Sequence, residues 1–308
     1  MANKTPKMRS YLSALPSFED GTASPRSFLE DCLASIDELE SEVGAFVVRN
    51  IEGARLAADL SSTRWKEGEM RSLIDGMPFC IKDIMETADM PTGQGSDLFP
   101  GWEGKRDCAA VAALREAGSV ILGKAVTTEF ASQPARGTRN PWDLKRTPGG
   151  SSSGTAASVG CGMVSVGLGT QGLGSTIRPA SFCGVFAFKP SLGGINRGGS
   201  FDYLSQSCST TFAATLEETW ILAREIVSRV GGDPGYKGVS GSMEPPPSKK
   251  PKRVAFLETE GWAEAEEGAR EAMSKARSRL TNSGIEVVDK SSHGVMLTLE
   301  NAIKGGVN

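Results

Sequence analysis

The chain has 308 residues, with 34 lysines and arginines against 37 aspartates and glutamates, so its net charge at neutral pH is −3. Hydrophobic residues make up 39% of the sequence and 37 residues are glycine, which supports a folded core and excludes disorder throughout the chain. The balanced charge lacks the basic excess that binds nucleic-acid phosphates, so we expect no nucleic-acid partner. Because neither a signal peptide nor a long apolar run is visible, we expect a cytoplasmic protein without a membrane partner.

Cysteine and histidine are not arranged as metal ligands. The closest two of the six cysteines, Cys161 and Cys183, are 22 residues apart (183 − 161), which excludes CxxC zinc pairs and a compact disulfide framework. His293 is the only histidine, so any Ser-His-Asp mechanism would depend on that residue. We therefore expect no metal and no cofactor, and a general base other than histidine if the chain is a hydrolase.

Predicted helices and strands alternate along the chain. Apolar residues at helical spacing predict helices at 24–41, 51–67, 107–117, 215–230 and 262–281. Short apolar runs predict strands at 78–82, 119–122, 254–257 and 285–288. This alternation is typical of an α/β fold with a mostly parallel or mixed sheet.

Two stretches of unusual composition differ in character. Residues 147–200 are rich in glycine and serine but contain apolar runs such as MVSVGLG, which indicates a glycine-packed core rather than a flexible linker. Residues 232–252 are polar and rich in proline, which predicts a surface loop. The basic run KKPKR at 249–253 fits either a nuclear-import address or a solvated loop edge, and the sequence leaves both open.

Two glycine motifs imitate nucleotide-binding loops. Residues 167–172 match GxGxxG, but no acidic residue lies between 173 and 201 to bind a ribose, and Pro179 interrupts the following helix. Residues 118–124 imitate a phosphate loop, but Ala125 replaces the hydroxyl that would bind magnesium. Neither motif therefore predicts a nucleotide cofactor.

Two segments that combine glycine and serine are the candidates for chemistry: 147–154 (TPGGSSSG) and 169–179 (GTQGLGSTIRP). Glycine allows successive N–H groups to converge on one point, as an oxyanion hole beside a serine nucleophile requires. With histidine so scarce, the remaining base is a neutral lysine. Lys82 is a candidate because it ends a predicted strand, and a lysine removed from water can lose its proton.

The span 70–195 resembles the amidase signature family. The matching text is GMPFCIKDIMETADMPTGQGS, GKAVTTEFA, TRNPWDLKRTPGGSSSGTAASVG and GLGTQGLGSTIRPASFCGVFAFKPS. The resemblance implies the amidase signature fold, with a mostly mixed β-sheet core covered by helices on both faces. It also implies the family's Ser–cis-Ser–Lys triad.

Carried over residue by residue, this triad falls on Lys82, Ser151 and Ser175, and the two serines are 24 residues apart (175 − 151), as the family pattern requires. The resemblance implies that Ser175 attacks an amide carbonyl, that Ser151 relays the proton to Lys82, and that the peptide bond before Ser151 is cis. The implied oxyanion hole consists of the backbone N–H groups of Gly172, Leu173, Gly174 and Ser175.

The second turn departs from the family's commonest form, roughly D-T/I-G-G-S, because it reads Gln171-Gly-Leu-Gly-Ser. Gln171 and the order Ser-Thr-Ile-Arg-Pro look like the malonamidase-like branch, in which the arginine holds a substrate carboxylate. Arg178 is therefore a candidate substrate-binding residue, and the alternative is an ion pair that secures the turn. Thr170 and Ser152 are further candidates near the substrate, although loop hydrogen bonding explains them equally well.

The resemblance also implies a domain plan. We expect an N-terminal helical region packed on the core at 1–69, the catalytic core at 70–231, the proline-rich loop at 232–252, and the start of a C-terminal α/β portion at 253–308. Since family members usually run longer, we expect the chain to be truncated or a shortened variant.

The expected function is that of a metal-independent amidase that hydrolyses a small carboxamide, with or without a carboxylate group, to an acid and ammonia. One alternative is an amidotransferase A-type glutaminase subunit, which passes ammonia to a tRNA-charging complex. The other is a truncated, inactive scaffold. The expected partner is the small-molecule amide, and a homodimer is compatible with the sequence.

Overall fold

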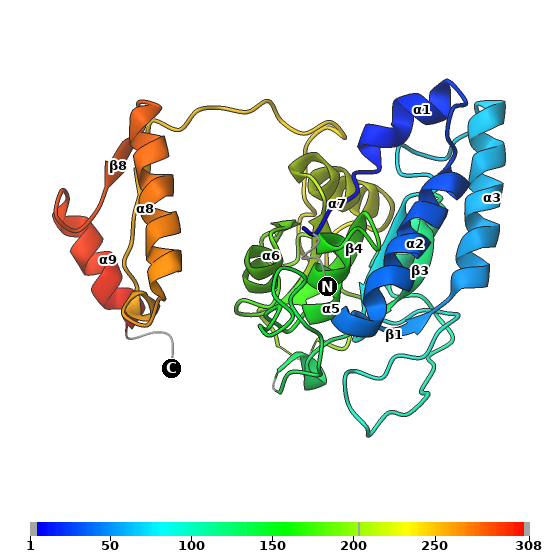
Figure 1. The fold of residues 1–308 in the computed structure, drawn as a ribbon, viewed down its shortest axis with the longest axis horizontal. Coiled ribbons are helices and arrows are strands. Elements are labelled where there is room, and N and C mark those ends of the chain that lie inside the picture. Colours follow the sequence, from blue (N-terminus) through cyan, green and yellow to red (C-terminus); the bar gives the residue numbers. More distant parts are fainter. Residues whose placement is uncertain (1–4, 133, 203, 305–308) are drawn as a thin grey trace. The chain divides into compact units, whose positions relative to one another are not determined.

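The computed structural model describes residues 5–132, 134–202 and 204–304 of the chain (Figure 1). The chain divides into two compact units, Met1–Pro246 and Pro247–Asn308. Within the described ranges, none of the helices has both the length and the apolar character needed to cross a membrane.

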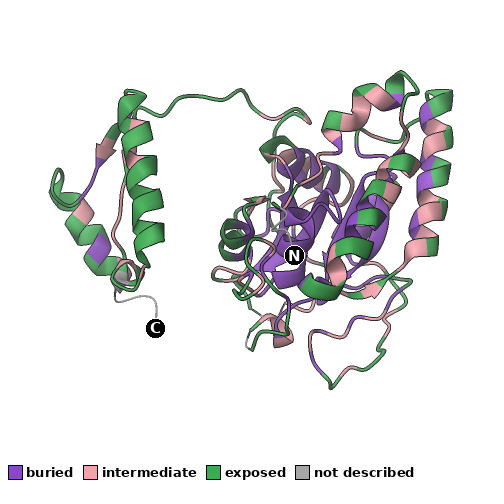
Figure 2. Cartoon of the chain, in the orientation of Figure 1, coloured by how far each residue is buried: buried purple, intermediate pink, exposed green. Residues whose placement is uncertain are grey.

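The first unit is built on a mixed six-stranded sheet. Its strands are β1 (Phe46–Arg49), β2 (Pro78–Lys82), β3 (Val120–Ala125), β4 (Val166–Gln171), β5 (Phe186–Phe188) and β6 (Cys208–Ala213), in the spatial order β1-β3-β2-β4-β6-β5. β2 runs parallel to β3 and β4, whereas the pairs β1/β3, β4/β6 and β5/β6 are antiparallel. β2, β3, β4 and β6 are buried at every residue (Figure 2). The predicted α/β fold with a mixed sheet is confirmed.

Helices cover both faces of this sheet. They are α1 (Leu15–Glu19), α2 (Pro25–Val43), α3 (Ile51–Glu67), α4 (Ala109–Glu116), α5 (Ser153–Gly160), α6 (Ile177–Cys183) and α7 (Leu216–Val230), with short 3₁₀ helices at Leu12–Ala14 and Glu129–Ala131. Phe79 and Ile81 of β2 pack in one apolar cluster with α4 and α7, whereas Cys80 packs in another with α2, α3 and α5. Because successive strand residues point to opposite faces, the sheet has a core on each side.

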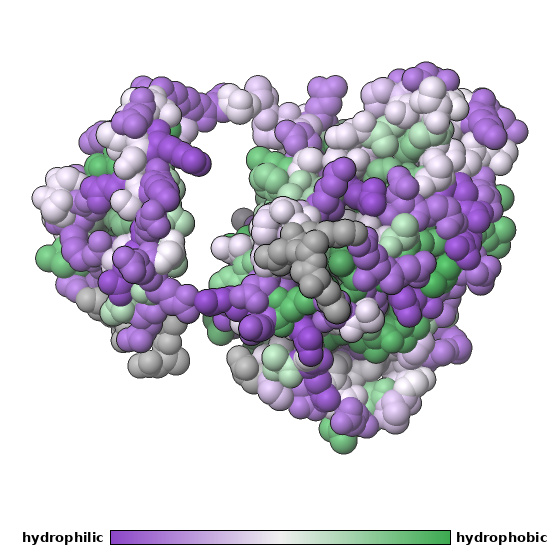
Figure 3. All heavy atoms as spheres, viewed as in Figure 1, coloured by the Kyte–Doolittle hydropathy of each residue, from purple (hydrophilic) through white to green (hydrophobic). Residues whose placement is uncertain are grey.

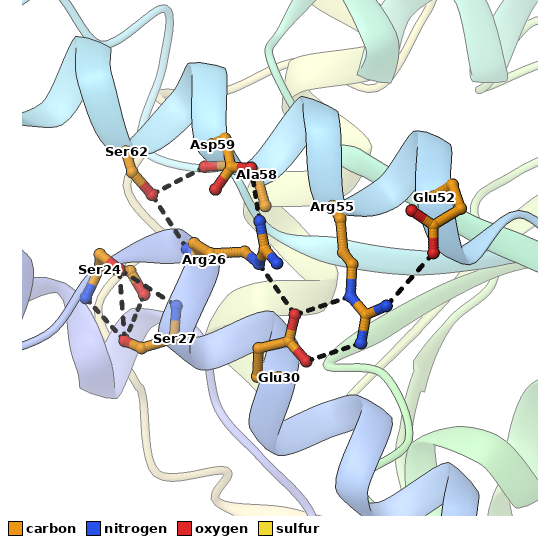
Figure 4. Close-up of polar contacts among 9 residues, drawn as sticks. All are labelled: Ser24, Arg26, Ser27, Glu30, Glu52, Arg55, Ala58, Asp59 and Ser62. Carbon is orange, nitrogen blue, oxygen red and sulfur yellow. Dashed lines mark hydrogen bonds and ion pairs between the residues drawn. The ribbon is translucent and has the colours of Figure 1, made fainter.

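Ion pairs join α2 and α3, which lie side by side (Figure 4). Glu30 of α2 accepts a hydrogen bond from Arg26 at 2.8 Å and one from Arg55 of α3 at 2.9 Å. Ser24 caps the start of α2, and α3 ends at Gly68, which has a left-handed backbone with φ 72°. These end signals explain why the helices predicted at 24–41 and 51–67 form with nearly the same bounds.

The glycine- and serine-rich stretch folds into α5, β4, α6 and β5, which helical or strand spacing did not predict. α5 is buried at every residue, so it has no polar face to produce an amphipathic pattern. Small residues are needed there because a Cβ on Gly154 would lie 2.2 Å from the carbonyl oxygen of Ala45 and 2.4 Å from the nitrogen of Val126. Within the stretch, α5 and β4 form a glycine-packed part of the core, as the apolar runs indicated, whereas α6 and β5 are partly exposed.

The second unit contains a parallel pair of strands, β7 (Arg253–Ala255) and β8 (Glu286–Val288), with the helices α8 (Glu267–Asn282) and α9 (Gly294–Lys304) and a 3₁₀ helix at Glu260–Trp262. α8 is exposed along most of its length (Figure 2) and mostly hydrophilic (Figure 3). The predicted start of this helix at 262 is wrong. Glu266 has an extended backbone with ψ 155°, so the helix begins only after it.

Candidate active site

Lys82 is the last residue of β2 and is fully buried. Its Nζ donates a hydrogen bond to Oγ of Ser151 at 2.7 Å and another to Oγ1 of Thr170 at 2.9 Å. Burial disfavours the ammonium form and lowers the pKa of Lys82 to about 7, although the nearby Asp202 carboxylate acts in the opposite direction. A substantial fraction of this amine is therefore neutral at physiological pH, as a general base must be.

Ser151 lies in the loop that leads into α5. The peptide bond between Gly150 and Ser151 is cis, and the side chain of Ser151 is buried. The backbone N–H of Thr128 donates to the carbonyl oxygen of Ser151 at 3.1 Å, which fixes the loop against the segment after β3.

Ser175 lies in the turn between β4 and α6 and is half-buried. The backbone N–H of Ser152 donates to the carbonyl oxygen of Ser175 at 3.2 Å, so the two glycine–serine segments meet. Oε1 of Gln171 accepts hydrogen bonds from the backbone N–H groups of Thr176 and Ile177, both at 2.9 Å. The Gln171 side chain thus closes the turn around Ser175.

The implied oxyanion hole has free donors. None of the four backbone N–H groups at 172–175 donates a hydrogen bond to another residue that the structure describes. Leu173 fits into this turn because its side chain is 86% exposed and points away from the packed interior. Four successive donors of this kind can bind an anionic oxygen.

Arg178 contacts a backbone carbonyl. Its Nε and Nη2 donate to the carbonyl oxygen of Gly150 at 3.1 and 2.6 Å. The described partner of Arg178 is therefore a carbonyl group and not the acidic side chain of an ion pair. The guanidinium nevertheless joins the start of α6 to the peptide group that precedes Ser151.

A pocket of about 180 Å³ lies beside the loop that leads to Ser151 and is lined by Thr128, Ser132, Ala135, Thr147, Gly149, Gly150, Arg178 and Phe182. Ser152 and Thr170, the other two candidates near the substrate, are fully buried and do not line this pocket. Thr170 accepts the hydrogen bond from Lys82 instead. Of the three candidate substrate-binding residues, only Arg178 lines this pocket.

Two charged features of the site were not predicted from the sequence, although Asp83 and Lys124 lie within the quoted stretches that resemble the family. Asp83 and Lys124 form a buried ion pair at 3.3 Å, and Lys124 also donates to Oγ1 of Thr92 at 2.6 Å. The negative charge of Asp202, a residue distant in sequence, raises the pKa of Lys82 against the larger effect of burial. Lys124 is a charged residue inside the apolar strand β3, and such a residue predicts a buried partner of opposite charge. No local sequence pattern predicts an effect of Asp202 on Lys82.

Among the described residues, no group of three or more His, Cys, Asp or Glu side chains could hold a metal ion. The six cysteines are buried and free. His293 lies in the second unit, whereas Lys82, Ser151 and Ser175 belong to the first.

Comparison with known proteins identifies relatives of this chain. The family model described as "Amidase" matches residues 27–304. The A-type subunit of glutamyl-tRNA(Gln) amidotransferase from Anaeromyxobacter sp. (strain K) is 40% identical over 209 residues, which are 66% of this chain and 41% of that protein. The chain thus spans about two fifths of the length of this curated relative.

Solved structures share the fold. One, described as "An unexpected vestigial protein complex reveals the evolutionary origins of an s-triazine catabolic enzyme", has a TM-score of 0.77 at 29% identity, covering 91% of this chain and 63% of that one. Another, "Crystal structure of amidase", has a TM-score of 0.76 at 26% identity, covering 91% of this chain and 62% of that one. With a family model matched over most of its length, the chain belongs to the amidase signature family.

Proposed function

We propose that this chain is a serine amidase that hydrolyses a small linear carboxamide to a carboxylic acid and ammonia, without a metal ion. The observation that carries the proposal is the 2.7 Å hydrogen bond from Nζ of Lys82 to Oγ of Ser151, together with a Lys82 pKa that burial lowers to about 7. A lysine in this state can act as the base that a serine nucleophile needs.

In the proposed mechanism, Oγ of Ser175 attacks the amide carbonyl carbon. The proton of Ser175 passes to Oγ of Ser151, and the proton of Ser151 passes to Nζ of Lys82, which becomes an ammonium ion. The oxygen of the tetrahedral intermediate accepts hydrogen bonds from the backbone N–H groups at 172–175.

Lys82 then returns its proton through Ser151 to the leaving nitrogen. The C–N bond breaks, ammonia leaves, and the acyl group remains on Ser175 as an ester. A water molecule attacks this ester with the same proton relay, which releases the acid and restores Ser175.

The pocket supports a small acyl group. Its volume of about 180 Å³ lies below the range of pockets that hold drug-sized ligands, roughly 300–1,000 Å³. Thr128, Ser132 and Thr147 give it hydroxyl groups, and Phe182 gives it an apolar wall. Because Arg178 is bonded to Gly150, we propose uncharged acyl groups as the main substrates, with carboxylate-bearing amides as the alternative.

The test is a panel of linear carboxamides with detection of released ammonia, run on the wild type, Ser175→Ala and Ser153→Ala. Ser153 is a matched control, because its hydroxyl donates to the carbonyl oxygen of Val126 at 3.2 Å and takes no part in the proposed relay. We expect release from at least one amide, a loss of about a thousandfold or more in Ser175→Ala, and retained activity in Ser153→Ala. A folded wild type that releases no ammonia from any amide would support the inactive scaffold instead.

The second candidate is an amidotransferase A-type glutaminase subunit. It is favoured by the 40% identity to a protein of that kind. Turnover of glutamine that appears only when partner subunits of a tRNA-charging complex are added, together with their capture by the chain in a pull-down, would support it. Turnover of simple amides by the chain alone would support the amidase.

A further inference from the structure

Two side chains hold the Lys82 amine. Its Nζ donates to Oγ of Ser151 at 2.7 Å and to Oγ1 of Thr170 at 2.9 Å. Ser151 is the relay in the proposed mechanism, whereas the hydroxyl group of Thr170 takes part in none of its steps. Because Thr170 is only 1% exposed and does not line the pocket, it acts on the site through Lys82 rather than through contact with a ligand.

Hydrogen bonds fix the backbone around Thr170. The residue lies near the end of β4, where it pairs with Ser209 of the antiparallel strand β6. Its carbonyl oxygen accepts a hydrogen bond from Oγ1 of Thr176, the residue after Ser175, at 3.2 Å. A threonine side chain branches at Cβ and therefore has few rotamers to choose from. The strand pairing and this stiffness hold Oγ1 of Thr170 in one place beside the amine.

The two protonation states of Lys82 need different partners. A neutral amine has two N–H groups and one lone pair, whereas an ammonium ion has three N–H groups and no lone pair. To take the proton of Ser151, the neutral amine must direct its lone pair at Oγ of Ser151, so an N–H group has to be bound elsewhere. Thr170 supplies the one acceptor other than Ser151 that the described residues offer to Nζ.

We propose that Thr170 is a positioning residue of this site, whose hydroxyl group accepts an N–H group of Lys82 and directs the lone pair of the neutral amine toward Ser151. When Lys82 takes the proton, the same hydroxyl group accepts a hydrogen bond from a charged donor, which is the stronger kind. The hydrogen bond is therefore present in both states and stabilises the ammonium ion more than the neutral amine. The catalytic consequence rests on the proposed amidase function, whereas the hydrogen bond itself does not.

The activity test compares Thr170→Val with Thr170→Ser in the amide panel. Valine keeps the shape and the branching of threonine but removes the hydroxyl group, so the amine loses this acceptor. We expect kcat to fall about tenfold or more in Thr170→Val, with KM changed less than about twofold, because the proposal gives Thr170 no contact with the substrate. Thr170→Ser keeps an Oγ and should recover most of kcat.

The matched control is Thr211→Val. Thr211 is a buried threonine of β6, and its Oγ1 donates to the carbonyl oxygen of Thr219 at 3.0 Å. The substitution removes a buried hydroxyl group from the same sheet without touching the amine of Lys82, so the variant should keep its activity.

A second test follows the titration of Lys82 itself, by NMR of protein labelled with ¹³C at the lysine Cε, with Lys82→Met to identify the signal. Loss of the acceptor disfavours the ammonium ion, so the midpoint should fall by about half a pH unit or more in Thr170→Val and stay unchanged in Thr211→Val.

The charged groups near Lys82 are the same in these variants and in the wild type. The Asp202 carboxylate raises the pKa of Lys82 against the larger effect of burial, and the neighbouring Asp83 is paired with Lys124 at 3.3 Å. A difference in midpoint between Thr170→Val and the wild type therefore reports the lost hydroxyl group.

An unchanged Lys82 midpoint, or an unchanged kcat, in folded Thr170→Val would overturn the proposal, and so would an equal fall in Thr211→Val. If Thr170→Val does not fold, the wild type decides the question. Interacting groups report each other's titration, so the ¹³C signal of the Thr170 Cβ must show an inflection at the Lys82 midpoint, and its absence would overturn the proposal. If the midpoint falls as expected but the wild type hydrolyses no amide, Thr170 has the proposed contact and the proposed function is wrong.

Discussion

The guanidinium group of Arg178 donates two hydrogen bonds to the carbonyl oxygen of Gly150, at 3.1 and 2.6 Å. Gly150 immediately precedes Ser151, and Arg178 follows Ser175 by three residues in the chain (178 − 175). One side chain thus connects the loop of Ser151, the proposed relay, to the segment that follows Ser175, the proposed nucleophile. We therefore propose that Arg178 supports the site, and its substitution tests this role.

We expect Arg178→Leu to slow the hydrolysis of neutral and acid-bearing amides to a similar degree, mainly through kcat. Hydrogen bonds from a charged donor contribute about 1.5–3 kcal/mol, so a loss of roughly tenfold or more is expected. Arg178→Lys should recover part of the rate. A loss more than about tenfold greater for acid-bearing amides would instead assign Arg178 to a substrate carboxylate.

The pH dependence of kcat/KM should follow Lys82. The neutral amine is the active form and its pKa is lowered to about 7, so activity should fall about tenfold per pH unit below about pH 7 and level off above about pH 8. Lys82→Ala should remove most of the rate together with this limb. His293→Gln should leave the pH profile of kcat/KM unchanged. If His293→Gln removed the fall in activity at acid pH while Lys82→Ala kept it, Lys82 would not be the base.

Lys82 should also reduce the stability of the fold. Its folded-state pKa lies below the unfolded value of about 10.4, so the unfolded chain binds more protons between about pH 7 and pH 10. The free energy of unfolding is therefore not reduced by Lys82 above about pH 10.4. It decreases as the pH falls from there to about 7, where the folded chain binds the proton as well. We expect the free energy of unfolding of Lys82→Met, minus that of the wild type, to increase as the pH falls from about 10 to about 7. Urea denaturation at several pH values measures this difference. A difference that does not vary with pH would argue against the lowered pKa.

The Gln171 side chain should shape the oxyanion hole. Gln171→Ala removes the acceptor for two backbone N–H groups, so the turn at 172–175 loses its closure. Since oxyanion donors act mainly in the transition state, kcat should fall about tenfold or more with little change in KM. Gln171→Glu keeps an acceptor oxygen and should retain more activity. Equal rates in Gln171→Ala and the wild type would show that the turn closes without this side chain.

The ion pair of Asp83 and Lys124 should matter for stability rather than for chemistry. Lys124→Met leaves the buried Asp83 carboxylate without its counter-charge, and such losses cost about 3–5 kcal/mol. Combining it with Asp83→Asn should restore much of the stability in chemical denaturation. If the double variant is less stable than Lys124→Met alone, the pair is not the source of the loss.

Several local features of this protein were predictable from short-range sequence patterns. The apolar spacing and end signals of α2 and α3 predicted their positions, because an amphipathic helix at the surface repeats its pattern every turn. The run PFCIK predicted β2 with Lys82 at its end, and the long glycine–serine motifs pointed to Ser151 and Ser175. These signals lie within a few residues of the features that they predict.

The surroundings of those residues depend on how distant segments pack together. α5 is buried on all sides and therefore has no periodic pattern to read. Arg178 bonds to Gly150, and Lys82 bonds to Ser151 and Thr170, through contacts between segments that are distant in sequence. Such contacts depend on how β2, β4 and β6 pair and on how α6 packs, and no local spacing encodes them. The candidate triad was therefore readable from the chain, whereas the groups that tune and hold it became visible only in the fold.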